Sequence, residues 1–288
     1  MNVFDILFTS FIGSLNWFYK SIIFELPWHQ NYFWGLTLIS FLVWGLEMMF
    51  PWRKTQKKFR KDFWLDFFYM YFNFFLFAAV ISGFYKLIGQ FFISQGLSMT
   101  SLALLDISQW QPFWAMLLFF VVLDFVQWLT HIALHKFPLF WRFHKVHHSV
   151  KEMGFAAHLR YHWMENILYK PLKTIALMLL GGFEPSQAFV VHFIAIGIGH
   201  LNHANILCDW GPLRYVLNNP VMHLYHHAKT LPQGRVGVNF GISLSVWDYV
   251  FKTSYVPEKN AHLPLGFEGD ENFPKGFVKQ SLSGFQNN

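Results

Sequence analysis

The most informative stretch for the fold of this chain is DFVQWLTHIALHKFPLFWRFHKVHHS, residues 124–149. It joins the end of an apolar run, residues 111–130, to five histidines. His131 and His135 are four positions apart, and His144 is followed by His147 and His148 at three and four positions. Residues at these spacings share one face of a helix. Each set is therefore predicted to direct its imidazoles toward one point, next to a segment that has the length of a membrane span.

The composition indicates an integral membrane protein. Hydrophobic residues make up 54% of the 288 residues, aromatic residues 21% and charged residues only 13%. A soluble domain normally carries about a quarter charged residues. With 36 Phe and 13 Trp, the chain has more aromatic surface than a soluble core could bury. The single cysteine, Cys208, excludes an intramolecular disulfide and a cysteine-based zinc site.

The positive charge is interpreted as a membrane feature. The net charge is +6, and the isoelectric point is near 9.3. Six basic residues directly follow an apolar segment, as cytoplasmic membrane anchors do: Arg53, Lys54, Lys57, Lys58, Arg60 and Lys61. Because no nucleic-acid-binding motif accompanies them, we expect no nucleic-acid partner.

Apolar runs predict about four transmembrane helices. Residues 32–51 and 111–130 each have the length of one span, whereas residues 63–93 exceed one span and are expected to continue as an interfacial turn. Residues 166–203 break at GGFEP, residues 181–185, and are predicted to form a hairpin of two helices.

The N-terminal segment is ambiguous. Residues 4–24 can span the membrane or lie in its interface, and we favour the interface because Asn16, Tyr19 and Lys20 interrupt the aromatic residues.

The distribution of Lys and Arg predicts an orientation. The basic 53–61 loop is expected to be cytoplasmic, the 94–110 segment without Lys or Arg to be outside, and the segment ending near Thr130 to return to the cytoplasm. The fold class that results is an all-α integral membrane protein with a histidine-rich helical part on the cytoplasmic side. We divide the chain into N-terminal membrane helices (1–110), a histidine-rich domain (111–255) and a polar C-terminal tail (256–288), loose from residue 262 onward.

Histidines are concentrated in one third of the chain. Thirteen of 15 lie between residues 131 and 227. A second HxxHH box, HLYHH, provides His223, His226 and His227, and the predicted hairpin returns His200 and His203 to the same side. Three clusters with His203 give nine imidazoles, which exceeds what one metal needs and indicates two metals with four or five nitrogens each.

Other groups have smaller roles in this interpretation. His162 and His200 are additional candidate ligands, and Asp124, Glu165 and Asp248 are candidates for orienting imidazoles through their second nitrogen. We interpret His29, His192 and His262 as structural.

The type of metal follows from what is missing. The sequence contains no His-Glu-x-x-His motif, so a zinc protease would lack its general base. A clear site of two histidines and one carboxylate is missing too. An all-nitrogen pair of metals at a membrane surface suits iron and oxygen chemistry on a lipid.

The motifs HIALH, HKVHH and HLYHH, in this order, resemble those of the membrane fatty acid hydroxylase superfamily, which includes sterol desaturases, C4-methyl sterol oxidases, fatty acid 2-hydroxylases and alkylglycerol monooxygenase. The resemblance covers roughly residues 115–255 and extends to RYHWMEN (160–166), HANI (203–206) and WDYVFKT (247–253). The chain departs from the family pattern at Trp163, Met164 and Lys252, where Pro, Leu and Gly are usual.

The resemblance implies a di-iron, oxygen-dependent enzyme that hydroxylates or desaturates lipid C–H bonds, built as a helical membrane base with a cytosolic metal-holding cap. Carried over residue by residue, the ligands would be His131, His135, His144, His147, His148, His203, His223, His226 and His227, with His200 or His162 completing the set. Zinc can replace iron in purified proteins of this kind.

Among the activities, we expect a monooxygenase acting on a fatty acyl, sterol or ether-lipid chain, with a desaturase on the same site as the alternative. The chain has no flavin, haem or nucleotide motif, so the electrons must come from a separate partner, such as a cytochrome b5-, ferredoxin- or reductase-like protein. A non-catalytic metal-binding or transport protein would favour histidines within the spans, where only His192 lies. The Phe and Trp residues near 111–141 could line a channel for the lipid, but we favour ordinary membrane packing for them.

The expected location is a membrane that the chain crosses several times. This would be the inner membrane in a bacterium or the endoplasmic reticulum in a eukaryote, with the active site facing the cytoplasm.

Overall fold

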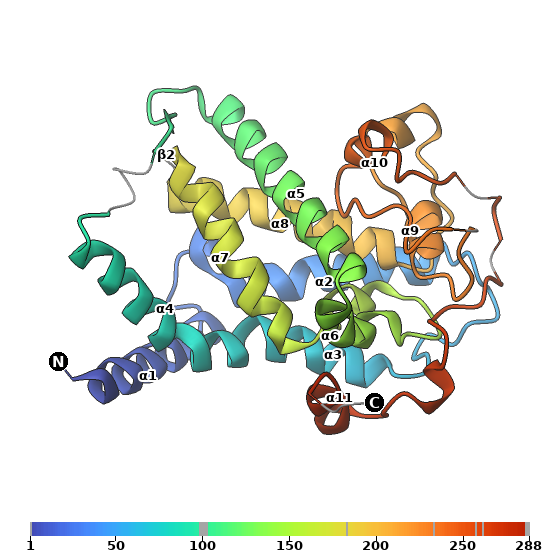
Figure 1. The fold of residues 1–288 in the computed structure, drawn as a ribbon, viewed down its shortest axis with the longest axis horizontal. Helices are drawn as coiled ribbons and strands as arrows, with labels where there is room; N and C mark the ends of the chain where they lie inside the picture. The colour runs from blue at the N-terminus through green and yellow to red at the C-terminus, as the bar shows by residue number, and fades with distance from the viewer. Residues whose placement is uncertain are drawn as a thin grey trace.

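The computed structural model describes residues 2–97, 103–182, 184–232, 234–256, 258–260 and 262–285, and its architecture is mostly helical (Figure 1). The α-helices are α1 (Val3–Ile22), α2 (Tyr32–Met49), α3 (Phe63–Tyr71), α4 (Phe77–Ser94), α5 (Pro112–Lys136), α6 (Pro138–His148), α7 (Trp163–Leu179), α8 (Pro185–His203), α9 (Pro220–His226), α10 (Val246–Val250) and α11 (Phe277–Ser283). Short 3-10 turns are η1 (Trp28–Gln30), η3 (Phe155–Leu159), η4 (Gly211–Tyr215) and η5 (Asp270–Asn272), and η2 (Phe72–Leu76) is a π-helical turn. The strands β1 (Leu105–Asp106) and β2 (Leu180–Gly181) form one parallel pair.

Three helical segments of the described chain are long and apolar enough to cross a membrane: α2, the continuous run from α3 to α4, and α5. The interfacial turn predicted within residues 63–93 is wrong, because η2 joins α3 to α4 without a break. At 1.5 Å per residue this run of 32 residues is roughly 48 Å long, more than the hydrocarbon core of a bilayer. Buried Leu36, Met70, Phe75 and Ile196 pack α2 and the α3–α4 run against α8.

Helix α1 lies along α4 (Figure 1) and does not belong to the three segments above. The two helices approach closely at Gly83, where a Cβ atom would lie 2.8 Å from the Cα atom of Leu7. The expected helix in residues 4–24 is therefore present and packed on the bundle. Whether it spans the membrane or lies in the interface stays a prediction.

Helices α7 and α8 form the expected hairpin. Gly182 in the connection has a φ of +93°, a conformation that favours glycine. The β1–β2 pair ties this end of the hairpin to the segment before α5. The return of α8 places His200 and His203 in its last turn, at the end of the molecule where α5 also finishes.

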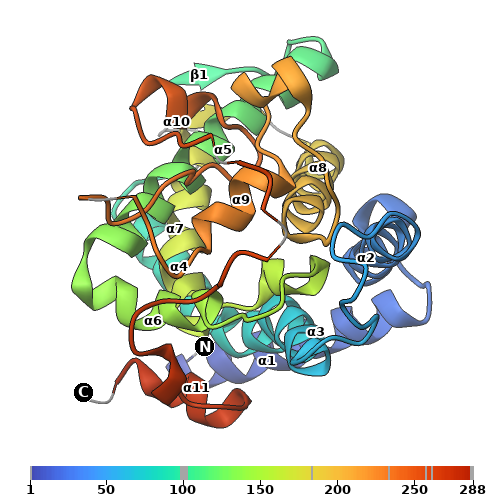
Figure 2. The ribbon, with the colours of Figure 1, turned by 90° about the vertical axis from the view of Figure 1, so that its right-hand side faces the viewer.

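The histidine-bearing elements form a cap at that end. Phe137 precedes a proline and has extended backbone angles, φ −94° and ψ 120°, so α5 stops and α6 begins at Pro138. Asn219 caps α9 by accepting a hydrogen bond from the Met222 amide at 2.9 Å. Figure 2 looks onto this end and shows α9 near the centre, with α5, α6, α7 and α8 around it.

The prediction of a loose segment after residue 262 is wrong for the described part of the tail. Gln280 in α11 is only 2% exposed, and the backbone oxygen of Ser281 contacts His162. Asp270 forms ion pairs with Lys151 and Lys229. Hydrogen bonds and ion pairs of this kind could not be read from a composition rich in Gly and charge.

Candidate metal centre

Nine histidines converge in two buried groups. One group contains His131, His135, His144, His148 and His226, and the other contains His147, His203, His223 and His227. Within each group, one ring nitrogen from every residue lies within 4.8 Å of the others. Eight of the nine residues are buried, and His135 is half-buried. These are the nine histidines that spacing and resemblance selected.

The two HxxHH boxes are shared between the groups. His144 and His148 belong to the five-histidine group, whereas His147 belongs to the four-histidine group. In α9, His226 joins the first group, and His223 and His227 join the second. The prediction that each box aims at one point is therefore wrong. Each box instead holds both groups in a fixed relation, because one short helix supplies both.

Backbone carbonyl groups orient the imidazoles from behind. The Nδ1–H groups donate to main-chain oxygens over 2.7 to 3.0 Å, in the pairs His131–Phe240, His147–Arg160, His203–Gly199 and His226–Val238. A neutral imidazole with its proton on Nδ1 has its lone pair on Nε2. These bonds therefore favour the tautomer in which Nε2 is the ligand atom.

The inner nitrogens lack protein partners that suit them. The Nε2 atoms of His135, His148 and His226 are buried and have no hydrogen-bond partner among the residues that the structure describes. Other Nε2 atoms face one another, at 2.9 Å for His203 and His223 and 3.2 Å for His131 and His144. Buried polar atoms in proteins are nearly always satisfied. A transition-metal ion in each group would satisfy them, and an all-imidazole donor set fits iron, zinc, copper or nickel.

Burial keeps these rings in the form that binds metals. It lowers the pKa of His147 to about 4 and moves the pKa of His226 well below its usual value. The imidazoles are therefore neutral at physiological pH, and metal binding at these residues does not have to displace a proton from Nε2.

Of the three carboxylates predicted to orient imidazoles, Glu165 does so. Its Oε2 atom lies 3.1 Å from Nδ1 of His144, and the residue is 2% exposed. Glu165 is held at the first turn of α7. A carboxylate in this position fixes the ring and raises the basicity of the ligand nitrogen.

Asp124 and Asp248 act differently from the prediction. Asp124 accepts hydrogen bonds from the amides of Ser243 and Leu244 and from the Trp247 indole. Asp248 accepts from the Trp128 indole, from the amides of Phe240 and Gly241, and from the Thr253 hydroxyl. Neither forms a hydrogen bond with an imidazole. Both hold residues 240–248 against α5, and through them the Phe240 oxygen that accepts from His131.

His162 and His200 lie outside the two groups. His162 caps α7 by accepting from the Met164 amide at 3.1 Å, and its Nε2 lies 2.9 Å from the backbone oxygen of Ser281. His200 contacts the Ser40 hydroxyl at 3.1 Å and Nδ1 of His158 at 3.1 Å. Both ring nitrogens of each residue therefore have protein partners.

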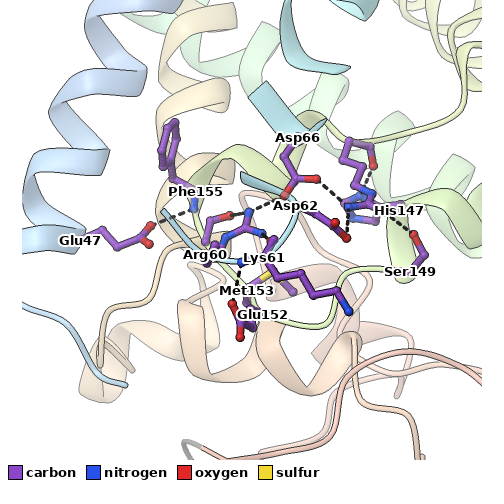
Figure 3. A network of polar contacts seen from close by, with 12 residues as sticks. Glu47, Arg60, Lys61, Asp62, Asp66, His147, Ser149, Glu152, Met153 and Phe155 are labelled. Atoms are coloured by element: carbon purple, nitrogen blue, oxygen red, sulfur yellow. Dashed lines mark hydrogen bonds and ion pairs between the residues drawn. The ribbon is translucent and has the colours of Figure 1, made fainter. Parts of the chain in front are cut away.

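A buried ion network supports the His147 side of the cap (Figure 3). Asp66 of α3 pairs with Arg60 at 2.5 Å and with Arg160 at 2.8 Å. All three residues are buried. Arg160 also donates to the Ser149 hydroxyl at 2.8 Å, and its backbone oxygen accepts from His147. The network connects α3 to His147 through Arg160, and the sequence analysis did not predict it.

A cavity of about 410 Å³ extends from the histidines into the bundle. His131, His144, His147 and His203, taken from both groups, line it at the cap end. His158 and His192 line it as well, so His192 faces the cavity, which the sequence reading did not predict. No Phe or Trp of residues 111–141 lines it, which agrees with the packing interpretation of those aromatic residues.

Comparison with known proteins finds similarity to lipid and fatty acid hydroxylases. The fatty acid hydroxylase family model matches residues 116–253. The ornithine lipid hydroxylase OlsE of Rhizobium tropici is 30% identical over 177 residues, which are 62% of this chain and 52% of that protein. Alkylglycerol monooxygenase of Caenorhabditis elegans is 28% identical over 164 residues, 55% of this chain and 30% of that protein.

A third relative is the fatty acid hydroxylase vlmA of Lecanicillium, which is 27% identical over 149 residues, 46% of this chain and 40% of that protein. The chain thus spans about half or less of the length of these relatives. No solved structure matches. The matched region contains both HxxHH boxes and all nine converging histidines, and in this region the chain is similar to fatty acid hydroxylases.

Proposed function

We propose that the chain is a membrane lipid monooxygenase in which the nine converging histidines hold two iron ions. The observation that carries this proposal is the position of both histidine groups at the wall of one cavity inside an apolar helical bundle. When bound, the irons would supply the activation of dioxygen and the oxidation of a C–H bond. The named relatives act on lipids or fatty acids, which supports a fatty acyl, sterol or ether-lipid chain as the substrate class.

The residues of the chain line the cavity and orient the imidazoles. Residues of the bundle helices line the cavity below the cap, so a lipid chain inside it would lie among side chains such as Phe74, Ala195 and Ile196. Backbone carbonyls and Glu165 fix the ring orientations before metal binds, so little reorganisation is needed. The buried Arg60–Asp66–Arg160 network holds Arg160 in place, and the backbone oxygen of Arg160 accepts the hydrogen bond from His147.

We also propose that a separate protein supplies the electrons and that the histidine-rich cap faces the cytoplasm. The basic 53–61 loop lies at the cap end, where the Lys61 amide donates to Glu152 at 2.9 Å and the Trp52 amide donates to the Asn205 oxygen at 2.8 Å. Lys54, Lys57 and Lys58 of this loop are exposed. Because such loops favour the cytoplasm, the cap is proposed to face it, in the inner membrane of a bacterium or the endoplasmic reticulum of a eukaryote.

The test is a lipid analysis of cells that express the chain under heavy-isotope dioxygen. The wild type is expected to produce lipids that have gained one labelled oxygen atom. The His147→Ala variant should lose this product at unchanged expression, whereas the exposed His262→Ala variant should keep it. Full product formation by His147→Ala would refute the assignment, and a product lighter by two hydrogens would assign desaturation instead.

A further inference from the structure

Helix α7 turns a polar face inward. Its residues at the cavity wall are Glu165, Asn166, Tyr169, Lys170 and Lys173. Their spacing of one, four, five and eight positions from the first places them on one helix face. The other faces expose Ile167, Leu172, Ile175 and Leu179. The helix is thus apolar outside and polar inside, the reverse of a helix on a soluble protein.

The two lysines of this face contact no carboxylate in the described part of the chain, and the charge of Asp124 acts on Lys173 only from a longer distance. In the described part of the chain, neither ammonium group forms a hydrogen bond or an ion pair, and that of Lys173 lies 5.5 Å from the centre of the Tyr169 ring. The one carboxylate at the cavity wall, Glu165, contacts His144 instead.

This arrangement is costly without a ligand. Like charges three positions apart on a helix repel each other, and a charge within an apolar bundle is unfavourable unless it is paired. The two partly buried lysines at the cavity wall therefore lack an anion in direct contact with them.

The lysines and the histidine groups share one cavity. Lys170 and Lys173 follow Glu165 by five and eight residues, so they lie roughly 8 and 12 Å further along the axis of α7 at 1.5 Å per residue. Glu165 itself contacts His144 at the other end of this face. A molecule whose charged end is held by the lysines can extend an apolar chain toward the nitrogens of both groups.

We propose that Lys170 and Lys173 bind the anionic group of an amphiphilic lipid substrate, a carboxylate or a phosphate, and so select the substrate and position its chain. This inference rests on the proposed function, because it names the class of lipid that the same site takes. The lysines are specificity-determining residues. They take no part in the oxidation itself.

The experiment measures binding to the purified full-length chain in detergent. The probes are hexadecanoate, a hexadecanoyl lysophosphatidate and the uncharged hexadecanol. The wild type is expected to bind at least one anionic probe about tenfold more tightly than hexadecanol, the gain typical of one hydrogen bond to a charged group. Preference for hexadecanoate or for the lysophosphatidate identifies the source of the anionic group.

Variants locate the preference. Lys170→Met combined with Lys173→Met should abolish it and leave hexadecanol binding unchanged, and Lys173→Arg should retain it. The control is Lys86→Met, because Lys86 is exposed on α4 and does not line the cavity. Equal binding of all probes by the wild type would overturn the proposal. So would an undiminished preference in the double variant, or an equal loss in the Lys86→Met control.

The binding measurement tests the lysine site, and the lipid analysis tests the proposed function, so each proposal can fail without the other. An anionic preference that depends on the lysines, without any oxygenated product in cells, would refute the proposed function and keep the lysine site. Oxygenated products from a wild type that shows no anionic preference would refute the lysine site and keep the proposed function.

Discussion

At the scale of single residues, the candidate centre is built by what stands behind each histidine. Four imidazoles donate to backbone oxygens, and His144 contacts Glu165. These contacts turn Nε2 of each ring inward before any ion binds. The residues that supply the oxygens, such as Gly199 and Val238, have no chemical function in their own side chains, yet their positions determine the ligand set.

Glu165→Gln tests this orienting role. The amide keeps the size of the side chain but puts a weaker acceptor at Nδ1 of His144, so the metal affinity of the five-histidine group should fall roughly 10- to 100-fold. Competition with a chelator of known affinity measures the loss, and the four-histidine group should be unaffected. Glu268→Gln, at an exposed position, is the control. An unchanged affinity in Glu165→Gln would show that the carboxylate does not support the ligand.

The sequence could predict the nine histidines but not their partners. Histidines at three- and four-residue spacing can be recognised in the sequence. Every residue has a backbone carbonyl, so the sequence does not show which carbonyl groups accept from the imidazoles. Asp124 and Asp248 looked like Glu165 in the sequence, because a buried carboxylate near a histidine box has the same appearance whether it binds an imidazole or an amide. Lys170 and Lys173 could have been noticed, since cations on the same helix face as Glu165 stand out in an otherwise apolar hairpin.

At the scale of elements, polar residues inside apolar runs explain where prediction failed. Residues 63–93 exceed the length of one span in the sequence, and the structure has a single helical run, Phe63–Ser94, with a π-helical turn. Within that turn, Asn73 donates to the backbone oxygens of Leu159 and Tyr161 at 3.3 and 2.8 Å. The break between α5 and α6 has a cause that is visible in the sequence, because Pro138 prevents α5 from continuing.

Asp66→Asn tests how strongly α3 is tied to the cap. Removing the carboxylate charge leaves the guanidinium groups of Arg60 and Arg160 buried with less compensation. The free energy of unfolding should therefore fall by about 3–5 kcal/mol, as for other broken buried ion pairs. Denaturant titration in detergent measures it.

The matched control for this change is Asp62→Asn. Asp62 lies 3.4 Å from Arg160, but its side chain is 35% exposed, so the loss should be at most about 1 kcal/mol. Equal losses for the two variants would contradict a special role for Asp66.

At the scale of the whole molecule, the basic loop and the metal-binding cap occupy one end, and the 103–110 segment with the β1–β2 pair occupies the other (Figure 1). The apolar helices connect the two ends. The mostly helical architecture, its long apolar helices and the hairpin could be predicted from hydropathy and turn residues. The packed C-terminal segment could not, because it depends on contacts between residues far apart in the chain, such as Tyr69 with Gln280.

The orientation of the molecule is testable with introduced cysteines. In a Cys208→Ser background, Lys57→Cys marks the basic loop and Leu104→Cys marks the opposite end; both native residues are exposed. A membrane-impermeant maleimide applied to intact cells, or to sealed microsomes with the cytoplasmic side inward, should label Leu104→Cys and leave Lys57→Cys unlabelled. The opposite labelling would place the cap outside the cytoplasm.

The central claim is that two metal ions sit between the nine histidines, and metal content per chain tests it most directly. The protein is purified without added metal and without chelating resin, as wild type, His226→Ala, His223→Ala and the double variant. We predict about two ions in the wild type, about one in each single variant because each loses a ligand of a different group, and none in the double variant. A wild type without bound metal, or a double variant that retains both ions, would contradict the account.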